Sequence, residues 1–178
     1  MKTSNVTCSC FSCSCPAGPW SDEPSFEEWT DPETGYDCRV ARHYFGHLCG
    51  YVRIPGDHPL FRVEPNAPVP GRLRDREEQM LEEPLGNRPP AQVLISVIEG
   101  HIHAGLLVDV HGGVTYAGPG MMSDDEILNG WWWGFDCNHM DDLSPNPEIP
   151  KVPEAEYRTF EYVKAECKSL AKQLSELD

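Results

Sequence analysis

The sequence predicts an α+β protein, with a mainly antiparallel sheet of four to six strands and a long C-terminal helix packed on it. Short segments rich in β-branched and aromatic residues, separated by turns that contain Gly and Pro, predict the strands. Apolar residues at spacings of three and four predict the helix, over about residues 154–177. The stripe consists of Phe160, Val163, Cys167, Leu170 and Leu174.

The length of 178 residues fits one domain of ordinary size. We expect residues 31–178 to form this single α+β domain, and residues 1–30 to form an irregular, Cys-rich N-terminal arm. Four cysteines crowd into the segment Cys8–Cys15. Thiolates at this density suit a soft metal such as zinc, and a Ser/Cys tail without a ligand is the alternative.

The first strands are predicted over Tyr36–Val40 and Leu48–Ile54. Residues 62–90 are polar and interrupted by prolines, which predicts an excursion, either an exposed short helix or a loop. The alternation over Val93–Ile98 and the apolar run Ala104–Val110 predict a hairpin. We expect this hairpin to form the centre of the sheet.

The segment Ser-Asp-Asp-Glu at residues 123–126 has the capping-box pattern, which predicts a short helix that Gly130 ends. Residues 131–135 follow as another strand. Because side chains alternate along a strand, Trp132 lies on the opposite face from its two tryptophan neighbours. Trp132 is therefore the best candidate for stacking on a ligand.

The charge of the chain excludes some classes of partner. A formal net charge of -15, with 29 acidic against 14 basic residues, argues against binding of nucleic-acid polymers. No stretch approaches the roughly 20 apolar residues that a membrane helix needs. The N-terminus also lacks the apolar centre of a secretory signal, so we expect a cytoplasmic protein with no membrane association.

Two polar clusters predict the functional site. In the first, Asp109 and His111 are two residues apart, a spacing that places both side chains on one strand face. The Gly112-Gly113 turn follows, and its exposed amides would suit an anion. A hairpin turn in which His111 only caps a strand is the alternative. The first cluster ends with Thr115 and Tyr116.

The second polar cluster, Asp136, Asn138 and His139, follows the tryptophan strand. Strand ends of one sheet commonly share an edge, so we expect His111 and Asp136 to lie in one pocket, with His139 and the Gly-Gly turn on its rim. A separate pair, His101 and His103, is either a metal-binding pair or part of an exposed hairpin.

Several segments together resemble a group of small proteins common in bacteriophage and prophage genomes. They are Leu48–Val52, Gly56–Leu60, Val110–Tyr116, Trp132–Cys137, Tyr157–Arg158 and Glu161–Val163. The resemblance implies a phage accessory protein that acts in the host bacterial cytoplasm, and it carries over no assigned reaction. This chain departs from the group at Asn138, in residues 62–105 and in the Cys-rich arm.

Three functions fit these patterns. The first is a protein that binds a small polar ligand, sequestering a nucleotide-derived host immune signal. Its binding residues would be His111, Gly112, Gly113, Thr115, Tyr116, Trp132, Asp136, Asn138 and His139.

The second function is a metal-dependent hydrolase of a phosphoester or related bond. In it a divalent ion such as zinc, held by Asp109, His111, Asp136 and His139, activates water. The third is a non-catalytic host-interaction protein whose polar cluster only stabilises the fold. A monomer and a homo-oligomer are both compatible with the sequence.

Overall fold

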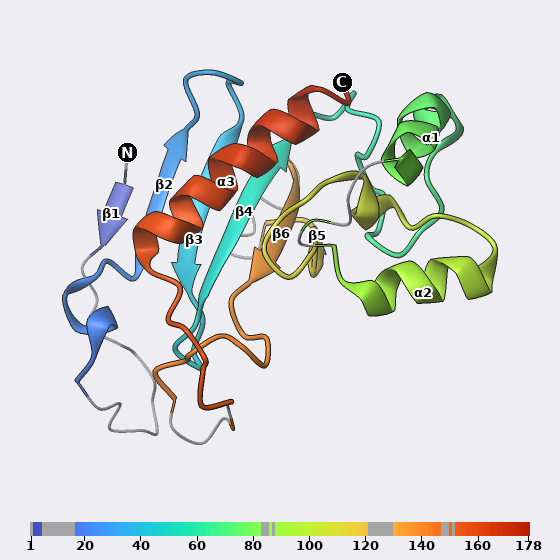
Figure 1. Ribbon diagram of the computed structural model, residues 1–178. Coiled ribbons are helices and arrows are strands. Elements are labelled where there is room, and N and C mark those ends of the chain that lie inside the picture. Colours follow the sequence, from blue (N-terminus) through green and yellow to red (C-terminus); the bar gives the residue numbers. More distant parts are fainter. Residues whose placement is uncertain are drawn as a thin grey trace.

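The computed structural model describes residues 2–4, 17–82, 86, 88–120, 130–146, 150 and 152–178. Over these residues six strands form one antiparallel sheet in the order β1-β2-β3-β4-β6-β5 (Figure 1). The prediction of an α+β fold with a mainly antiparallel sheet is confirmed. The strands are β1 (Lys2–Ser4), β2 (Phe26–Thr30), β3 (Asp37–Arg42), β4 (Leu48–Ile54), β5 (Tyr116–Gly118) and β6 (Trp131–Asp136).

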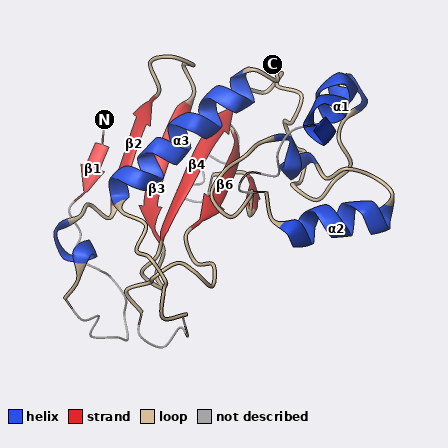
Figure 2. Cartoon of the chain, viewed as in Figure 1, coloured by secondary structure: helices blue, strands red, loops and turns tan. Residues whose placement is uncertain are grey.

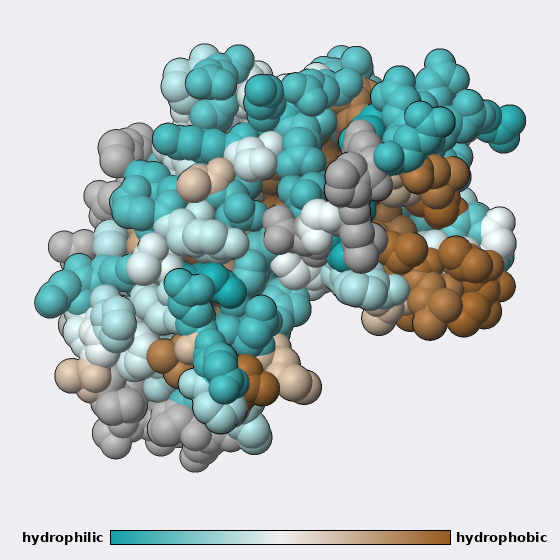
Figure 3. All heavy atoms as spheres, in the orientation of Figure 1, coloured by the Kyte–Doolittle hydropathy of each residue, from teal (hydrophilic) through white to brown (hydrophobic). Residues whose placement is uncertain are grey.

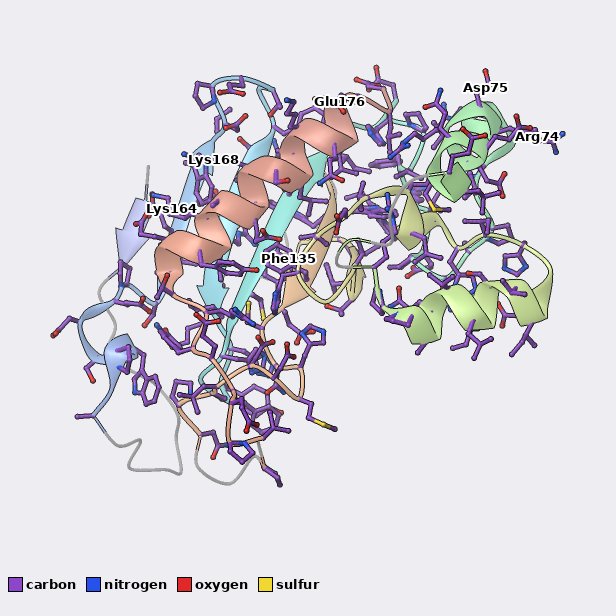
Figure 4. All side chains as sticks on the ribbon, viewed as in Figure 1. Arg74, Asp75, Phe135, Lys164, Lys168 and Glu176 are labelled. Atoms are coloured by element: carbon purple, nitrogen blue, oxygen red, sulfur yellow. The ribbon has the colours of Figure 1, made fainter. Side chains whose placement is uncertain are left out.

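The C-terminal helix α3 (Phe160–Ser175) crosses one face of the sheet over β3 and β4, as predicted (Figure 1). Thr159 caps its N-terminus, where the hydroxyl accepts a hydrogen bond from the backbone N–H of Tyr162. All five residues of the predicted stripe are buried. Phe135 on β6 lies beneath this helix and belongs to the same apolar core (Figure 4).

The predicted hairpin at the sheet centre is wrong, because residues 90–99 form helix α2 (Pro90–Glu99). Pro90 stands at the start of the helix, where its missing N–H is harmless. Gly100 ends the helix in the left-handed conformation, with φ of 74°, and its N–H donates to the carbonyls of Ser96 and Val97. A short apolar run does not by itself distinguish strand from helix, and these flanking residues decide.

The second half of the predicted hairpin is a 3-10 turn (Ala104–Leu107) followed by extended chain. This run is apolar because it is buried in the core, not because it pairs in the sheet. The Gln173 side chain of α3 takes the place of a neighbouring strand. Its amide accepts from Asp109 N at 2.7 Å and donates to Asp109 O at 2.8 Å.

Helix α2 lies beside the sheet rather than on it (Figure 2). One side of the helix is exposed and apolar, and Figure 3 shows the brown surface that gathers there. The exposed side chains are Leu94, Ile95, Val97 and Ile98. An exposed apolar patch of this kind is typical of an interaction surface.

The excursion predicted over residues 62–90 contains helix α1 (Arg74–Glu82), the first of its two alternatives. Only Met80 of this helix is buried. The N-terminal arm is less irregular than predicted, because β1 and β2 within residues 1–30 join the sheet. The cysteines of Cys8–Cys15 and the capping box at residues 123–126 lie outside the described residues.

Replacing Gly100 with Ala is expected to lower the free energy of unfolding by about 1 kcal/mol, because a Cβ is disfavoured at this positive φ. A Cβ at this position meets no atom within 4 Å, so the loss is conformational and not steric. Gly71→Ala is the control, since Gly71 is equally open and its φ is not positive. Urea denaturation of both variants makes the comparison, and an equal response of the two would contradict the helix end at Gly100.

Candidate functional site

A fully buried carboxylate, Asp142, organises the polar residues on the α3 side of the sheet. Its Oδ2 accepts from His111 Nε2 at 2.9 Å, from His139 Nδ1 at 3.0 Å and from His139 N at 3.0 Å. Its Oδ1 accepts from Arg158 Nε at 2.9 Å. His111 Nδ1 lies 3.1 Å from the Tyr162 hydroxyl. These five residues are called the Asp142 network below.

The Asp142 network joins three parts of the chain. His111 follows the extended run after the 3-10 turn, and His139 and Asp142 come from the loop after β6. Asp142 forms a parallel bridge with Glu156, which brings Arg158 to its carboxylate. The Arg158 guanidinium in turn lies 5.4 Å from the centre of the Tyr162 ring.

The electrostatics of the network favour an ionised aspartate. Burial alone would raise the pKa of Asp142, but hydrogen bonds from His111, His139 and Arg158 outweigh it and hold that pKa well below its usual range. The hydrogen bond to Asp142 raises the pKa of His139. Asp142 is therefore a carboxylate at neutral pH, and His139 gains a proton more readily than an ordinary histidine.

The network has the donor types of a metal site. His111 Nε2, His139 Nδ1 and an Asp142 oxygen all lie within 4.8 Å of one another, and two imidazoles with one carboxylate suit zinc. Arg158 disfavours the binding of a metal cation here, because its guanidinium already lies 2.9 Å from the Asp142 carboxylate and repels a second positive charge. The hydrogen bonds of Asp142 are satisfied by protein donors alone.

The predicted common pocket of His111 and Asp136 is wrong. Trp133 and Phe135 pack in the core under α3, so alternation along β6 directs Asp136 to the other face of the sheet. His111 is bound to Asp142 and Tyr162 on the α3 side. A loop aspartate therefore has the role that the sequence suggested for Asp136.

One of the two amides of the Gly112-Gly113 turn, which the sequence suggested for an anion, is engaged within the protein. Gly113 N donates to Val110 O at 2.9 Å, and His111 N donates to Glu166 at 2.8 Å. The His139 ring lies against Gly112, where a Cβ would come within 1.9 Å of the ring carbon Cε1. Glycine is required at this position by the close approach of the histidine and by a φ of 64°.

A cleft of about 320 Å³, called the aromatic cleft below, collects other predicted binding residues. Thr115, Tyr116, Asp136 and Asn138 all line it. The other lining residues come mainly from β4 and from the turn before it, and no functional motif in the sequence marks them. They are His43, Phe45, His47, Cys49, Tyr51 and Phe135.

Two tyrosines of the aromatic cleft face each other across a glycine of β6. Tyr51, Gly134 and Tyr116 stand in register on the adjacent strands β4, β6 and β5. The two rings are nearly perpendicular, with centroids 5.6 Å apart. A Cβ at position 134 would lie 2.4 Å from Tyr51 Cδ1, so the glycine makes room for this ring on the sheet.

The turn between β3 and β4 forms another side of the aromatic cleft. His43 N donates to His47 O at 2.8 Å, and the two imidazoles stack with centroids 4.6 Å apart. Burial lowers the pKa of His43, so its ring is neutral at neutral pH. Asp136 Oδ1 accepts from Asn138 N at 3.0 Å, which fixes the loop after β6 against the same cleft.

Two other predicted site residues have structural roles. Trp132 is only 4% exposed, and the Arg39 guanidinium covers its ring at 4.3 Å from the centroid. The face of Trp132 that was predicted to stack on a ligand is therefore covered by Arg39. The Arg39 guanidinium in turn forms an ion pair with the Glu28 carboxylate at 2.6 Å. Asp109 is bound through its backbone to Gln173 and lies apart from the Asp142 network.

Comparison of the chain with protein-family models, curated proteins and solved structures finds no match. The phage-protein resemblance therefore stays a prediction. None of the helices in the described residues has the length and apolar character needed to cross a membrane.

Proposed function

We propose that the protein binds a small polar ligand with a planar ring in the aromatic cleft, and that this ligand is nucleotide-derived. The observation that carries the proposal is the composition of the cleft, in which Phe45, Tyr51 and Tyr116 stand beside Asp136 and Asn138. The volume of about 320 Å³ falls at the lower end of small-molecule pockets.

The side chains of the aromatic cleft are suited to a nucleobase. Aromatic rings offer faces and edges on which any base stacks. The Asp136 carboxylate accepts hydrogen bonds from amino and imino groups, and the Asn138 amide both donates and accepts. Among the described lining residues there is no Lys or Arg. The cleft therefore recognises the ring, and a phosphate attached to the ligand remains in solvent.

The Asp142 network supports this function from the opposite side of the sheet. It ties the loop that leads from His111 to Tyr116 to the loop that follows Asp136. Both loops carry residues of the aromatic cleft. Holding them together preorganises the site, which lowers the entropy lost when a ligand binds.

The resemblance to phage accessory proteins supports a biological role for this binding. Under it, the protein acts in the host cytoplasm and sequesters a nucleotide-derived immune signal. A sequestering protein needs no catalytic group in contact with the ligand, and the aromatic cleft contains stacking and hydrogen-bonding groups without a metal cluster among its described residues.

A ligand panel tests the proposal. Thermal-shift measurement followed by calorimetry with guanosine, adenosine and their 5′- and 3′,5′-cyclic monophosphates should identify at least one ligand. We expect Asp136→Asn to weaken its binding by at least about tenfold, since a hydrogen bond to a charged group contributes about 1.5–3 kcal/mol.

Asp141→Asn is the matched control for charge, because Asp141 lies in the same loop and does not line the aromatic cleft. This control should bind as the parent protein does. Absence of binding for the entire panel, or equal weakening by both substitutions, would refute binding of the base in this cleft.

A metal-dependent hydrolase is the second candidate function, and the proximity of His111, His139 and Asp142 favours it. Its site would be the Asp142 network, where His139 is the most exposed of the three ligands. Turnover of the same nucleotides, abolished by EDTA and by His139→Ala, would support hydrolysis. Unchanged nucleotides after prolonged incubation with zinc would support binding alone.

A further inference from the structure

We infer that Glu99, His101 and His103 form a binding site for a divalent metal ion of the zinc class, separate from the aromatic cleft and from the Asp142 network. His103 Nε2 lies 2.6 Å and His101 Nε2 lies 3.6 Å from the same oxygen of Glu99. The three ligand atoms all lie within 4.8 Å of one another. This set is called the Glu99 site below.

The end of helix α2 builds the Glu99 site. The left-handed turn at Gly100 reverses the chain, so that the carboxylate of the last helical residue meets the two histidines that follow. His101 N donates to Ser96 O at 3.2 Å, and His103 N donates to the Ser96 hydroxyl at 3.2 Å. Helix-end hydrogen bonds thus hold the backbone of both histidines in place.

The distances suit a zinc ion with a small adjustment. Zinc holds imidazole nitrogens and carboxylate oxygens at about 2.0–2.2 Å, which places tetrahedral ligand atoms about 3.3–3.5 Å apart. The pair His101–Glu99 already has this separation, and the pair His103–Glu99 must open by less than about 1 Å. The Glu99 side chain is about half exposed and is free to make this shift.

The electrostatics favour a cation at the Glu99 site more than at the Asp142 network. The ion pairs that Glu99 makes with described residues are those with His101 and His103. Among the described residues no guanidinium forms an ion pair with Glu99, in contrast to Arg158 beside Asp142. The site also lies at the C-terminus of α2, the negative end of the helix dipole.

The Glu99 site opens onto a cavity of about 570 Å³. Glu99 and His103 line this cavity together with the polar side chains of Glu64, Asn66 and Gln92. An ion with three protein ligands keeps a fourth position open, as catalytic and ligand-binding zinc sites do. The cavity would supply that position with water or with an oxygen ligand.

Zinc calorimetry on the EDTA-treated full chain tests this inference. Cys8, Cys10, Cys13 and Cys15 are replaced by Ser in every sample, because thiolates also bind zinc. We expect Glu99→Gln and His101→Ala each to weaken zinc binding by at least about tenfold, the scale at which even outer-shell substitutions act on metal sites. Both side chains are at least one third exposed, so both variants should fold.

Glu78→Gln is the control, since it removes the same charge from an exposed position of α1. In parallel, ¹⁵N-detected imidazole spectra should show the ring nitrogens of His101 and His103 moving on addition of zinc. Lowering the pH from about 7.5 to about 5.5 should weaken zinc binding, because protons compete with the metal ion for the nitrogen atoms of ligating imidazoles.

Three results would overturn the inference. The first is a chain without the four cysteines that binds no zinc. The second is zinc binding by Glu99→Gln and His101→Ala as strong as that of Glu78→Gln. The third is a zinc-induced shift of the His111 and His139 rings with those of His101 and His103 unchanged, which would assign the ion to the Asp142 network.

Discussion

Replacing Asp142 with Asn is expected to lower the free energy of unfolding by about 3–5 kcal/mol, the usual effect of breaking a buried ion pair. The carboxylate is 0% exposed and accepts hydrogen bonds from His111, His139 and Arg158. Asparagine retains one acceptor oxygen and turns an amide NH₂ toward a donor. The Arg158 guanidinium would then lose its buried counter-charge and keep only ion pairs with the exposed side chains of Glu156 and Asp141.

Asp141→Asn is the control for this substitution. It makes the same change one residue earlier, at a side chain that is 70% exposed and 3.8 Å from Arg158. Its effect should stay below about 1 kcal/mol, as for other surface ion pairs. Urea denaturation at neutral pH makes the comparison, and equal losses in both variants would mean that burial of the network contributes nothing.

The difference between the parent protein and Asp142→Asn should depend on pH. The pKa of Asp142 is lower in the folded protein than in the unfolded chain, where it is about 3.9. Ionised Asp142 therefore stabilises the fold above this pH, and the stabilisation is lost as the pH falls below it. The pKa of His139 is higher in the folded protein than in the unfolded chain, where it is about 6.5. Protonated His139 therefore stabilises the fold fully below this pH, and the stabilisation is lost as the pH rises through the pKa of the folded protein. The difference should therefore be largest between these limits.

Replacing Leu170 with Asp is expected to cost more than about 4 kcal/mol and to leave little folded protein at 37 °C. Leu170 is 0% exposed and belongs to the core between α3 and the sheet. The substitution removes apolar contacts and introduces a carboxylate that no partner compensates. Circular dichroism during thermal unfolding measures the loss.

Ala165→Asp introduces the same side chain at an exposed position of the same helix. Its cost should be about 0.7 kcal/mol, the difference in helix propensity between the two residues. The pair thus separates burial from helix propensity. A similar melting temperature for both variants would show that α3 does not depend on its apolar stripe for docking.

The local sequence pattern predicts two kinds of element correctly. The first is a helix that is buried along one face, and the second is a short strand whose residues are mostly buried. The stripe from Phe160 to Leu174 predicts α3 because only a helix places these positions on one face. The segments that became β4 and β6 were recognised by β-branched and aromatic residues between turns. Acidic composition and length also needed no structure, since both are properties of the whole chain.

The local pattern does not predict the structure of two other apolar runs. One is a helix with an exposed apolar side, and the other is buried without pairing to a strand of the sheet. Residues 93–98 alternate in a way that suits a strand, yet Pro90 and Gly100 make them a helix with an exposed apolar side. The run from Ala104 to Val110 is apolar because α3 and the sheet enclose it. Burial of this kind is set by distant parts of the chain, so local periodicity does not report it.

By itself the sequence determined the α+β class, the docking helix and the segments that carry the polar residues. Only the tertiary structure decided which of those residues meet. Strand alternation directs Asp136 away from His111, while the loop after β6 brings the Asp142 carboxylate within hydrogen-bonding distance of His111. The aromatic cleft likewise needs β4, β6 and β5 side by side, because residues such as Tyr51 and Tyr116 become neighbours only through strand pairing between segments far apart in the chain.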